Sequence, residues 1–115
     1  MRAAWYERTG AAREVLVVGE MPDPDPGPGE VRVKLATSGV NPSDWKARMG
    51  SRPMIAPRII PHSDGAGIID KVGAGVPAAR VGERVWIWNG QWKRPFGTCA
   101  TMIAVPAEQT VKLPE

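Results

Sequence analysis

The sequence predicts a mainly β fold, a small and mostly antiparallel β-barrel with one or two short helices. The chain has 115 residues, which is the length of one ordinary domain. Its 13 glycines and 12 prolines are well above average usage and predict many turns, which argues against a helix bundle. About six or seven short apolar segments, separated by turn residues, have the pattern of strands.

The N-terminal part predicts a β-hairpin followed by a stiff loop. Apolar runs at residues 2–8 and 15–21 flank the turn-forming segment 9–12, as in two strands joined by a turn. The proline-rich segment 22–29 lacks many of the N–H donors that a central strand needs. We therefore expect a surface loop within one domain.

The next two segments predict the clearest strand and the longest helix of the chain. Residues 30–37 alternate apolar and polar side chains, which predicts a strand with one buried face. Residues 41–50 predict a short helix, with Asn41 or Ser43 as its N-cap and Gly50 as its stop.

The C-terminal half predicts an ordered loop and four more strands. The loop spans residues 51–61 and contains three prolines. The Asn89-Gly90 pair offers a tight hairpin turn. The four strands cover residues 65–72, 84–88, 98–105 and 110–113.

Two glycine clusters, Gly65-Ala-Gly67 and Gly73-Ala-Gly75, do not fit a phosphate-binding turn. Neither has a third glycine at the spacing of the dinucleotide fingerprint, and neither opens a helix. Glycine within a strand more often marks a bulge or a close approach of two backbones. We therefore expect these glycines to serve packing.

One cysteine and one histidine limit metal and thiol chemistry, because a structural zinc site needs four Cys/His ligands. Cys99 lies in an apolar segment, so we expect an inert thiol. His62 is expected to be a hydrogen-bonded loop residue. Any other zinc site would need three of the remaining candidate ligands to converge from separate elements, and these candidates are Asp44, His62, Asp64 and Cys99.

A dense polar group occupies the start of the predicted helix at 41–50. Free N–H groups at a helix start favour an anion or a polarised ligand. The same residues are also suited to capping the helix, and the sequence leaves both roles open. The group consists of Asn41, Ser43, Asp44 and Lys46.

Five tryptophans in 115 residues is a clear excess, and three of them lie close together. Trp86 and Trp88 share one face of a strand, and we expect them to fill the core, with Trp92 near a hairpin tip. The alternative is a base-stacking platform for single-stranded nucleic acid, flanked by the cations Lys93 and Arg94.

The overall charge and the N-terminus argue against several classes of protein. A formal charge of +3 is far below that of a dedicated nucleic-acid binder, so we do not expect nucleic acid as a partner. Glu7 and Arg8 interrupt the apolar run of a secretory signal, and no window approaches the ~18 apolar residues of a membrane span. These features predict a soluble, cytoplasmic protein without a membrane partner.

Several motifs occur in the order in which one large enzyme family carries them. They are Val31-Arg-Val-Lys34, Gly39-Val-Asn-Pro-Ser-Asp44, Ser63-Asp-Gly-Ala-Gly-Ile-Ile69, Val72-Gly-Ala-Gly-Val76, Val81-Gly-Glu-Arg-Val85 and Leu113-Pro-Glu115. With them the chain resembles the N-terminal half of the catalytic domain of medium-chain dehydrogenases/reductases. Within that family it looks like the zinc-free NADPH:quinone oxidoreductase (zeta-crystallin-like) branch. The resemblance implies a GroES-like, partly open β-barrel over residues 1–115.

The resemblance also implies that the catalytic zinc is absent. Zinc-containing relatives have cysteine and histidine where this chain has Asn41 and Ser63, and its own histidine, His62, is displaced by one position. The four-cysteine lobe of the structural zinc is missing too, since the segment 90–97 is short and has no cysteine. We therefore expect no metal site.

By resemblance, the chemistry is hydride transfer from NADPH to a quinone or an enone, without a metal. Asn41, Asp44 and Lys46 are then the catalytic candidates, and the candidates for cofactor contacts are Asn41, Pro42 and Ser43. Many relatives have tyrosine at the place of Lys46, so we expect Lys46 to stabilise a developing oxyanion by its charge instead.

Family members continue with a Rossmann domain that carries most of the cofactor site, and no such domain lies in these 115 residues. We therefore expect a piece of a longer oxidoreductase that is inactive alone. The whole protein is expected to act on a small-molecule quinone or enone and to form a homo-oligomer. The alternatives are a small β-barrel that binds single-stranded nucleic acid and a structural interaction module.

Overall fold

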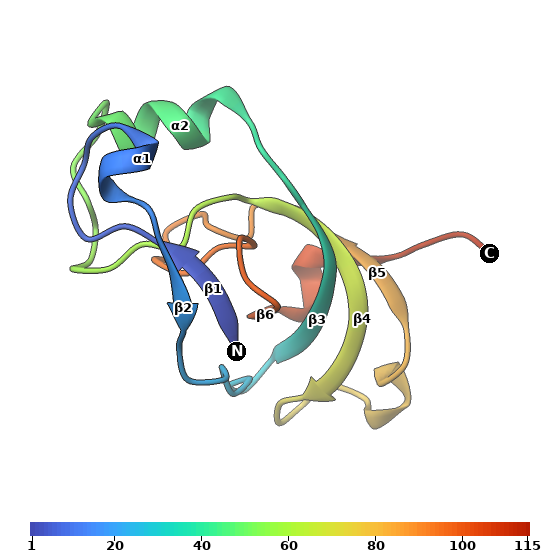
Figure 1. Ribbon diagram of the computed structural model, residues 1–115. Helices are drawn as coiled ribbons and strands as arrows, with labels where there is room; N and C mark the ends of the chain where they lie inside the picture. Colours follow the sequence, from blue (N-terminus) through green and yellow to red (C-terminus); the bar gives the residue numbers. More distant parts are fainter.

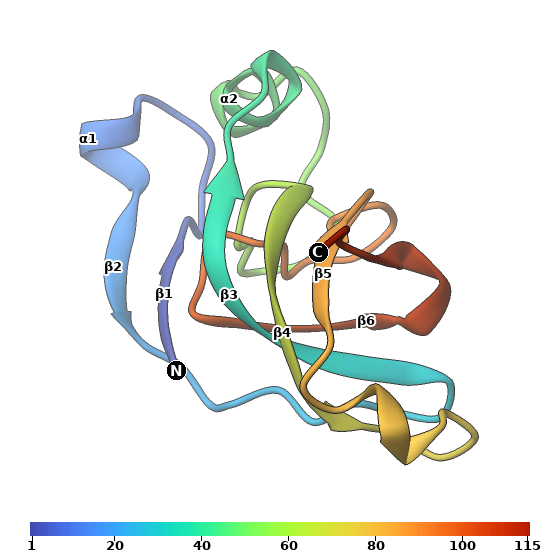
Figure 2. The same cartoon turned by 90° about the vertical axis from the view of Figure 1, so that its right-hand side faces the viewer.

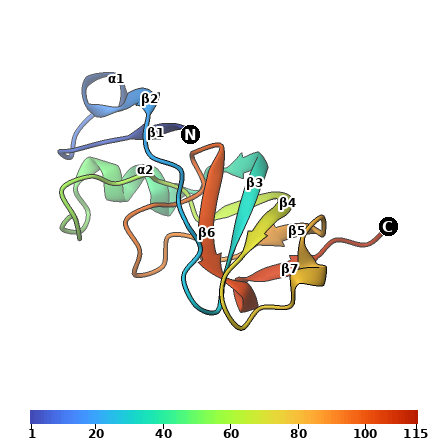
Figure 3. The ribbon, with the colours of Figure 1, turned by 90° about the horizontal axis from the view of Figure 1, so that it is seen from below.

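The computed structural model describes residues 1–115 and has two β-sheets at opposite ends of an elongated molecule. A two-stranded sheet lies with the helices at one end, and a five-stranded sheet forms the other end (Figure 1). The view from below shows the same division, with the C-terminus leaving from the five-stranded end (Figure 3). The fold is mainly β with two short α-helices, as the sequence predicts.

The two-stranded sheet is the predicted N-terminal hairpin. Strands β1 (Arg2–Trp5) and β2 (Val17–Glu20) pair antiparallel. The connection between them is longer than the predicted turn, because a helical turn, α1 (Ala12–Val15), takes up its second half. Val15 is 4% exposed and packs against Tyr6, so tertiary burial of one side chain explains a helix that the local pattern does not predict.

The five-stranded sheet has the order β6-β3-β4-β5-β7, and every neighbouring pair is antiparallel. The edge strands β6 and β7 do not pair with each other, so the barrel is partly open. Figure 2 shows β3, β4 and β5 curving side by side. The strands are β3 (Glu30–Gly39), β4 (Asp64–Val72), β5 (Arg84–Ile87), β6 (Met102–Pro106) and β7 (Thr110–Lys112).

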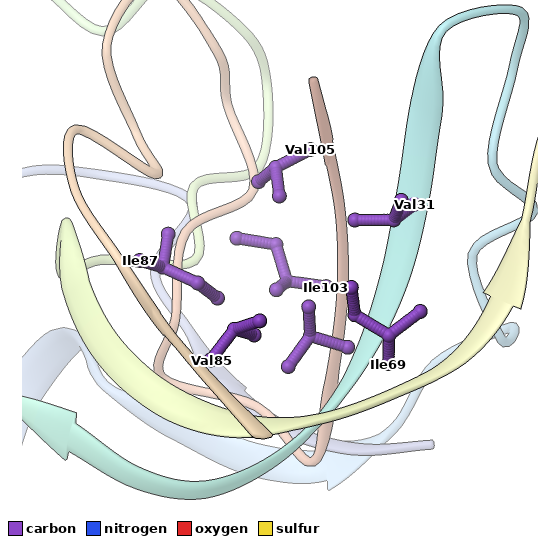
Figure 4. Close-up of a cluster of buried hydrophobic side chains, with 7 residues drawn as sticks. Val31, Ile69, Val85, Ile87, Ile103 and Val105 are labelled. Carbon is purple, nitrogen blue, oxygen red and sulfur yellow. The ribbon is translucent and has the colours of Figure 1, made fainter. Parts of the chain in front are cut away.

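The main core fills the inside of the curved sheet. Alternate residues of β3 point inward, which confirms the period-two pattern of residues 30–37. The inward side chains of four strands point toward one another (Figure 4). Burial of each such Val or Ile is worth about 1.5–3 kcal/mol. The cluster consists of Val31, Val33, Ile69, Val85, Ile87, Ile103 and Val105, each at most 2% exposed.

Trp86 and Trp88 do not fill this core, and that prediction is wrong. The two rings do share a face, but it is the outer one, where Trp86 is 43% and Trp88 is 40% exposed. Val85 and Ile87 occupy the inward positions, and the alternation of a strand turns their neighbours outward. Indole rings in these inward positions would overfill a small barrel.

Two further details of the C-terminal half differ from the predictions. Asn89 and Gly90 do not form a hairpin turn, since β5 pairs with β4 and β7 and not with the segment that follows it. The strand expected at 98–105 begins only at Met102, so Cys99 lies in a loop. The Cys99 thiol is half-buried, and burial raises its pKa, which fits the expected inert thiol.

Gly67 and Gly73 serve close backbone approaches, as predicted, whereas Gly75 has open space around it and a left-handed backbone with a φ of 84°. A Cβ at Gly67 would collide with the backbone of Lys34, in the region where the register of the β3–β4 pair shifts. A Cβ at Gly73 would collide with the carbonyl group of Gly27. Only glycine allows these two pairs of chain segments to come so close.

Helix α2 (Pro42–Met49) begins and ends where the sequence predicts. Pro42 occupies its first turn and is exposed, and Asn41 is the N-cap. Gly50 ends the helix in the left-handed conformation, with a φ of 108°. With eight residues α2 is the longest helix, and no helix of the chain is long and apolar enough to cross a membrane.

Candidate functional site

Asp44 holds the start of α2. Its carboxylate accepts a hydrogen bond of 2.7 Å from the backbone N–H of Asn41, which is the acidic half of a capping box. Asp44 is only 6% exposed, so this carboxylate is buried at the helix start. Asp44 therefore caps the helix, which is one of the two roles that the sequence left open.

The side chain of Asn41 reaches across to β4. Its Nδ2 donates a hydrogen bond of 2.6 Å to the carboxylate of Asp64, the first residue of that strand. This amide–carboxylate pair joins the start of α2 to the start of β4. No three His, Cys, Asp or Glu side chains of residues 1–115 converge as a group of metal ligands.

A directed chain of hydrogen bonds begins at His62. Its Nδ1 lies 2.8 Å from the Ser38 hydroxyl, which lies 2.9 Å from the Thr98 hydroxyl, and Thr98 donates to the carbonyl of Asp64 at 2.8 Å. Because a carbonyl only accepts, Thr98 donates to it, Ser38 donates to Thr98, and His62 Nδ1–H donates to Ser38. Burial lowers the pKa of His62, which favours the neutral ring, and the charge of Asp44 opposes this shift.

A cleft of about 430 Å³ opens beside α2, which is within the size range of small-molecule sites. Ser43 and Ala47 lie one helical turn apart and contribute the wall from α2. Residues of the loops 52–59 and 89–94 form most of the remaining lining. The charged residues that line the cleft are all basic: Arg52, Lys93 and Arg94.

The cleft brings together only some of the site residues expected from the sequence. Ser43 lines it directly, and Asn41 and Asp44 lie at the helix start beside it, engaged in the hydrogen bonds described above. Lys46 does not line the cleft. Its ammonium group is exposed and lies 5.8 Å from the centre of the Trp45 ring.

Tyr6 and Arg52 line the cleft, although no motif in the sequence singles them out. Tyr6 is placed there by a backbone pairing with Ile59, and a contact between residues so distant in the chain leaves no local signal. Trp92 and Lys93 also line the cleft. The mixture of aromatic ring and cation that suggested a nucleic-acid platform is therefore part of a cleft wall.

Three residues with a left-handed backbone lie at or beside the cleft. They are the only residues other than glycine with a positive φ, which is 81° at His62, 50° at Asn89 and 56° at Lys93. Asn89 and Lys93 line the cleft, and His62 precedes the lining residue Ser63. Unfavourable backbone conformations of this kind cluster at binding and catalytic sites, which supports the cleft as the functional site.

Comparison with known proteins agrees with this geometry. Residues 27–115 match the model of the alcohol dehydrogenase GroES-like domain. The chloroplast envelope quinone oxidoreductase homolog of Arabidopsis thaliana is 35% identical over 88 residues, which are 74% of this chain and 27% of that protein. An alcohol dehydrogenase of Geobacillus stearothermophilus is 37% identical over 94 residues, which are 77% of this chain and 27% of that protein.

Solved structures show the same likeness. The quinone oxidoreductase of Escherichia coli, complexed with NADPH, aligns with a TM-score of 0.82 and 25% identity over 99% of this chain and 33% of that chain. This chain thus spans about a quarter of the two curated relatives and about a third of the solved one. The family model matches most of the chain, and the relatives named above are oxidoreductases. The chain therefore belongs to the alcohol dehydrogenase GroES-like domain family of the medium-chain dehydrogenases/reductases.

Proposed function

We propose that this chain is the GroES-like part of an NADPH-dependent oxidoreductase that reduces a quinone or an enone without a metal. Relatives that are oxidoreductases, one of them complexed with NADPH, support this class of reaction. The observation that connects it to this chain is the cleft beside α2. There the motif that ends at Asp44 meets the motif that begins at Ser63, joined by the Asn41–Asp64 hydrogen bond.

In this proposal a Rossmann domain of the full-length protein holds most of the cofactor. Residues 1–115 contain no glycine-rich dinucleotide fingerprint, so they contact only the nicotinamide end. The donor set at the start of α2 fits that task. Ser43 lines the cleft, and its hydroxyl makes no hydrogen bond within the chain.

When bound, NADPH supplies a hydride, and the residues of this chain supply positioning and charge. Ser43 and Asn41 are the polar partners for the cofactor, with Pro42 beside them in the first turn. Asp44 acts through its hold on Asn41 and is a positioning residue. Lys46 lies outside the cleft lining, so its role as an oxyanion-stabilising cation requires a substrate that extends along the exposed side of α2.

The metal-free part of the proposal rests on the chemistry of the side chains. Zinc in this family is held by thiolate and imidazole ligands, whereas the corresponding positions carry the amide of Asn41 and the hydroxyl of Ser63. The neighbouring Asp64 is already engaged by Asn41. Asn41 and Asp64 form a hydrogen-bonded contact in place of a ligand set.

The proposal is tested with the purified full-length protein. NADPH oxidation is measured with 1,4-naphthoquinone and with 2-cyclohexen-1-one, before and after dialysis against a chelator. We expect oxidation that depends on the acceptor and that chelation leaves unchanged. No oxidation with either acceptor would contradict the reaction, and activity that chelation removes and zinc restores would contradict the metal-free mechanism. Light scattering on the same sample tests the expected homo-oligomer.

A further inference from the structure

Tyr6, the only tyrosine of the chain, has a fixed place in the cleft. Its backbone N–H donates to the carbonyl of Ile59 at 2.9 Å, and the N–H of Ile59 donates back at 3.0 Å. The ring packs against Val15 and Ile59, and the whole residue is 3% exposed. The phenol is therefore positioned by backbone pairing and by packing against Val15 and Ile59.

The Tyr6 hydroxyl opens onto the cleft. It makes no hydrogen bond within the chain. It is also not sealed off from solvent, because Trp5 Nε1 is the only fully buried side-chain nitrogen or oxygen that lacks a hydrogen-bond partner. Burial raises the pKa of Tyr6. The charges of Arg52 and Arg48 oppose this shift, and the charge of Asp44 adds to it. At neutral pH the phenol is therefore a protonated hydrogen-bond donor, and its natural partner in the cleft is a carbonyl oxygen.

Two cations without an acidic partner face the same cleft. Arg94 is neutralised by Glu30, whose carboxylate lies 3.2 Å away. Arg52 forms no ion pair, and Lys93 lies 4.5 Å from the centre of the Trp92 ring without an acidic neighbour in contact. No acidic residue lines the cleft, so its charge is complementary to an anion.

The remaining lining suits a flat, apolar ligand. Trp92 is 60% exposed and Ile55 is 63% exposed, and both belong to the cleft. An exposed indole ring offers a stacking surface for another planar ring. The cleft is thus suited to a ligand that has a planar ring, a carbonyl oxygen and a negative charge.

We propose that the cleft selects planar carbonyl compounds that carry a carboxylate, with the Tyr6 hydroxyl donating to the carbonyl oxygen and with Arg52 and Lys93 binding the carboxylate. This inference rests on the proposed function and narrows it, from quinones and enones in general to those with an acidic substituent. Neutral quinones and enones leave both cations without a partner and bind less tightly.

Two probes separate the contribution of the charge from that of the ring and the carbonyl. Chromone is a planar neutral enone, and chromone-2-carboxylate adds one negative charge to the same ring. Calorimetric titration of the full-length protein without NADPH is expected to show about tenfold tighter binding of the carboxylate, the usual effect of one charge-assisted hydrogen bond. The preference is expected to shrink as salt is added, because exposed charges are screened.

Three variants assign the effect to residues. Arg52→Gln is expected to remove most of the preference for the carboxylate. Arg13→Gln is the matched control, since Arg13 is an exposed arginine of α1 without an ion pair, and it should leave the preference unchanged. Tyr6→Phe keeps the ring that packs on Val15 and is expected to weaken both probes alike, by about three- to tenfold.

Equal affinity of the unaltered protein for the two probes would overturn the inference, as would a preference that survives Arg52→Gln. If Arg52→Gln weakens NADPH binding and leaves both probes unaffected, the cation serves a cofactor phosphate and the substrate assignment is wrong. If no acceptor supports NADPH oxidation while the carboxylate preference follows Arg52, the proposed function fails and the binding inference stands.

Discussion

The side-chain amide of Asn41 and the carboxylate of Asp64 form a hydrogen bond of 2.6 Å that ties the start of α2 to the start of β4. The backbone N–H of Asn41 is held at the same time by Asp44, at 2.7 Å. Asn41 is thus fixed through both its main chain and its side chain. This double hold sets the direction in which the first turn of α2 presents Ser43 to the cleft.

Removal of the Asp44 carboxylate is expected to lower stability. Asp44→Ala leaves the N–H of Asn41 without its partner, and loss of such a cap costs about 0.5–2 kcal/mol of the free energy of unfolding. Asp44→Asn keeps an oxygen acceptor and should lose less. Urea denaturation of the three proteins measures the differences. An unchanged midpoint for Asp44→Ala would show that the capping contact contributes nothing.

Tyr6 is expected to titrate above the usual range of about 10, because burial raises its pKa. The tyrosinate absorbance of the chain reports on Tyr6 alone, since the chain has one tyrosine. A group whose folded-state pKa is raised stabilises the fold below its unfolded-state pKa and loses this contribution as the pH rises through the folded value. Stability should therefore fall as the pH rises above about 10. A half-titration point equal to that of the urea-unfolded chain would refute the burial argument.

The Arg80–Glu83 pair predicts a dependence of stability on acid. A guanidinium nitrogen of Arg80 lies 2.8 Å from the Glu83 carboxylate, and this hydrogen bond lowers the pKa of Glu83. A group with a lowered folded-state pKa stabilises the fold above its unfolded-state pKa, about 4.3, and loses this contribution as the pH falls through the folded value. Glu83→Gln should lose less stability between about pH 5 and pH 3 than the unaltered chain. Glu108→Gln is the control, because Glu108 is exposed and forms no ion pair; thermal unfolding across this pH range compares the three.

Gly67→Ala is expected to destabilise the β3–β4 pair. The new methyl group would collide with the backbone of Lys34, and overpacking of this kind costs about 1–3 kcal/mol. Gly39→Ala is the matched change on the partner strand. Its methyl group would lie 3.4 Å from the Cβ of Asp64, an ordinary contact. Equal melting temperatures for the two variants would contradict the role assigned to Gly67.

Much of the candidate site follows from motifs that are short in sequence. Asn41, Ser43 and Asp44 lie within four residues, so their gathering at a helix start is a local event. The tertiary structure added Tyr6 and Arg52 to the cleft, which no motif marks. It also left Lys46 outside the cleft, with its ammonium group near the Trp45 ring.

The sequence by itself determined the features whose physical cause is local: the alternation of β3, the cap and the glycine stop of α2, and the family motifs. It also determined that Trp86 and Trp88 share a face, since side chains alternate along a strand. Only the tertiary structure decided that this face is the outer one, because the buried side of a strand is set by what packs against it. The same reason applies to the helical turn at Val15 and to the place of Tyr6, which depend on Ile59 and therefore on contacts between distant parts of the chain.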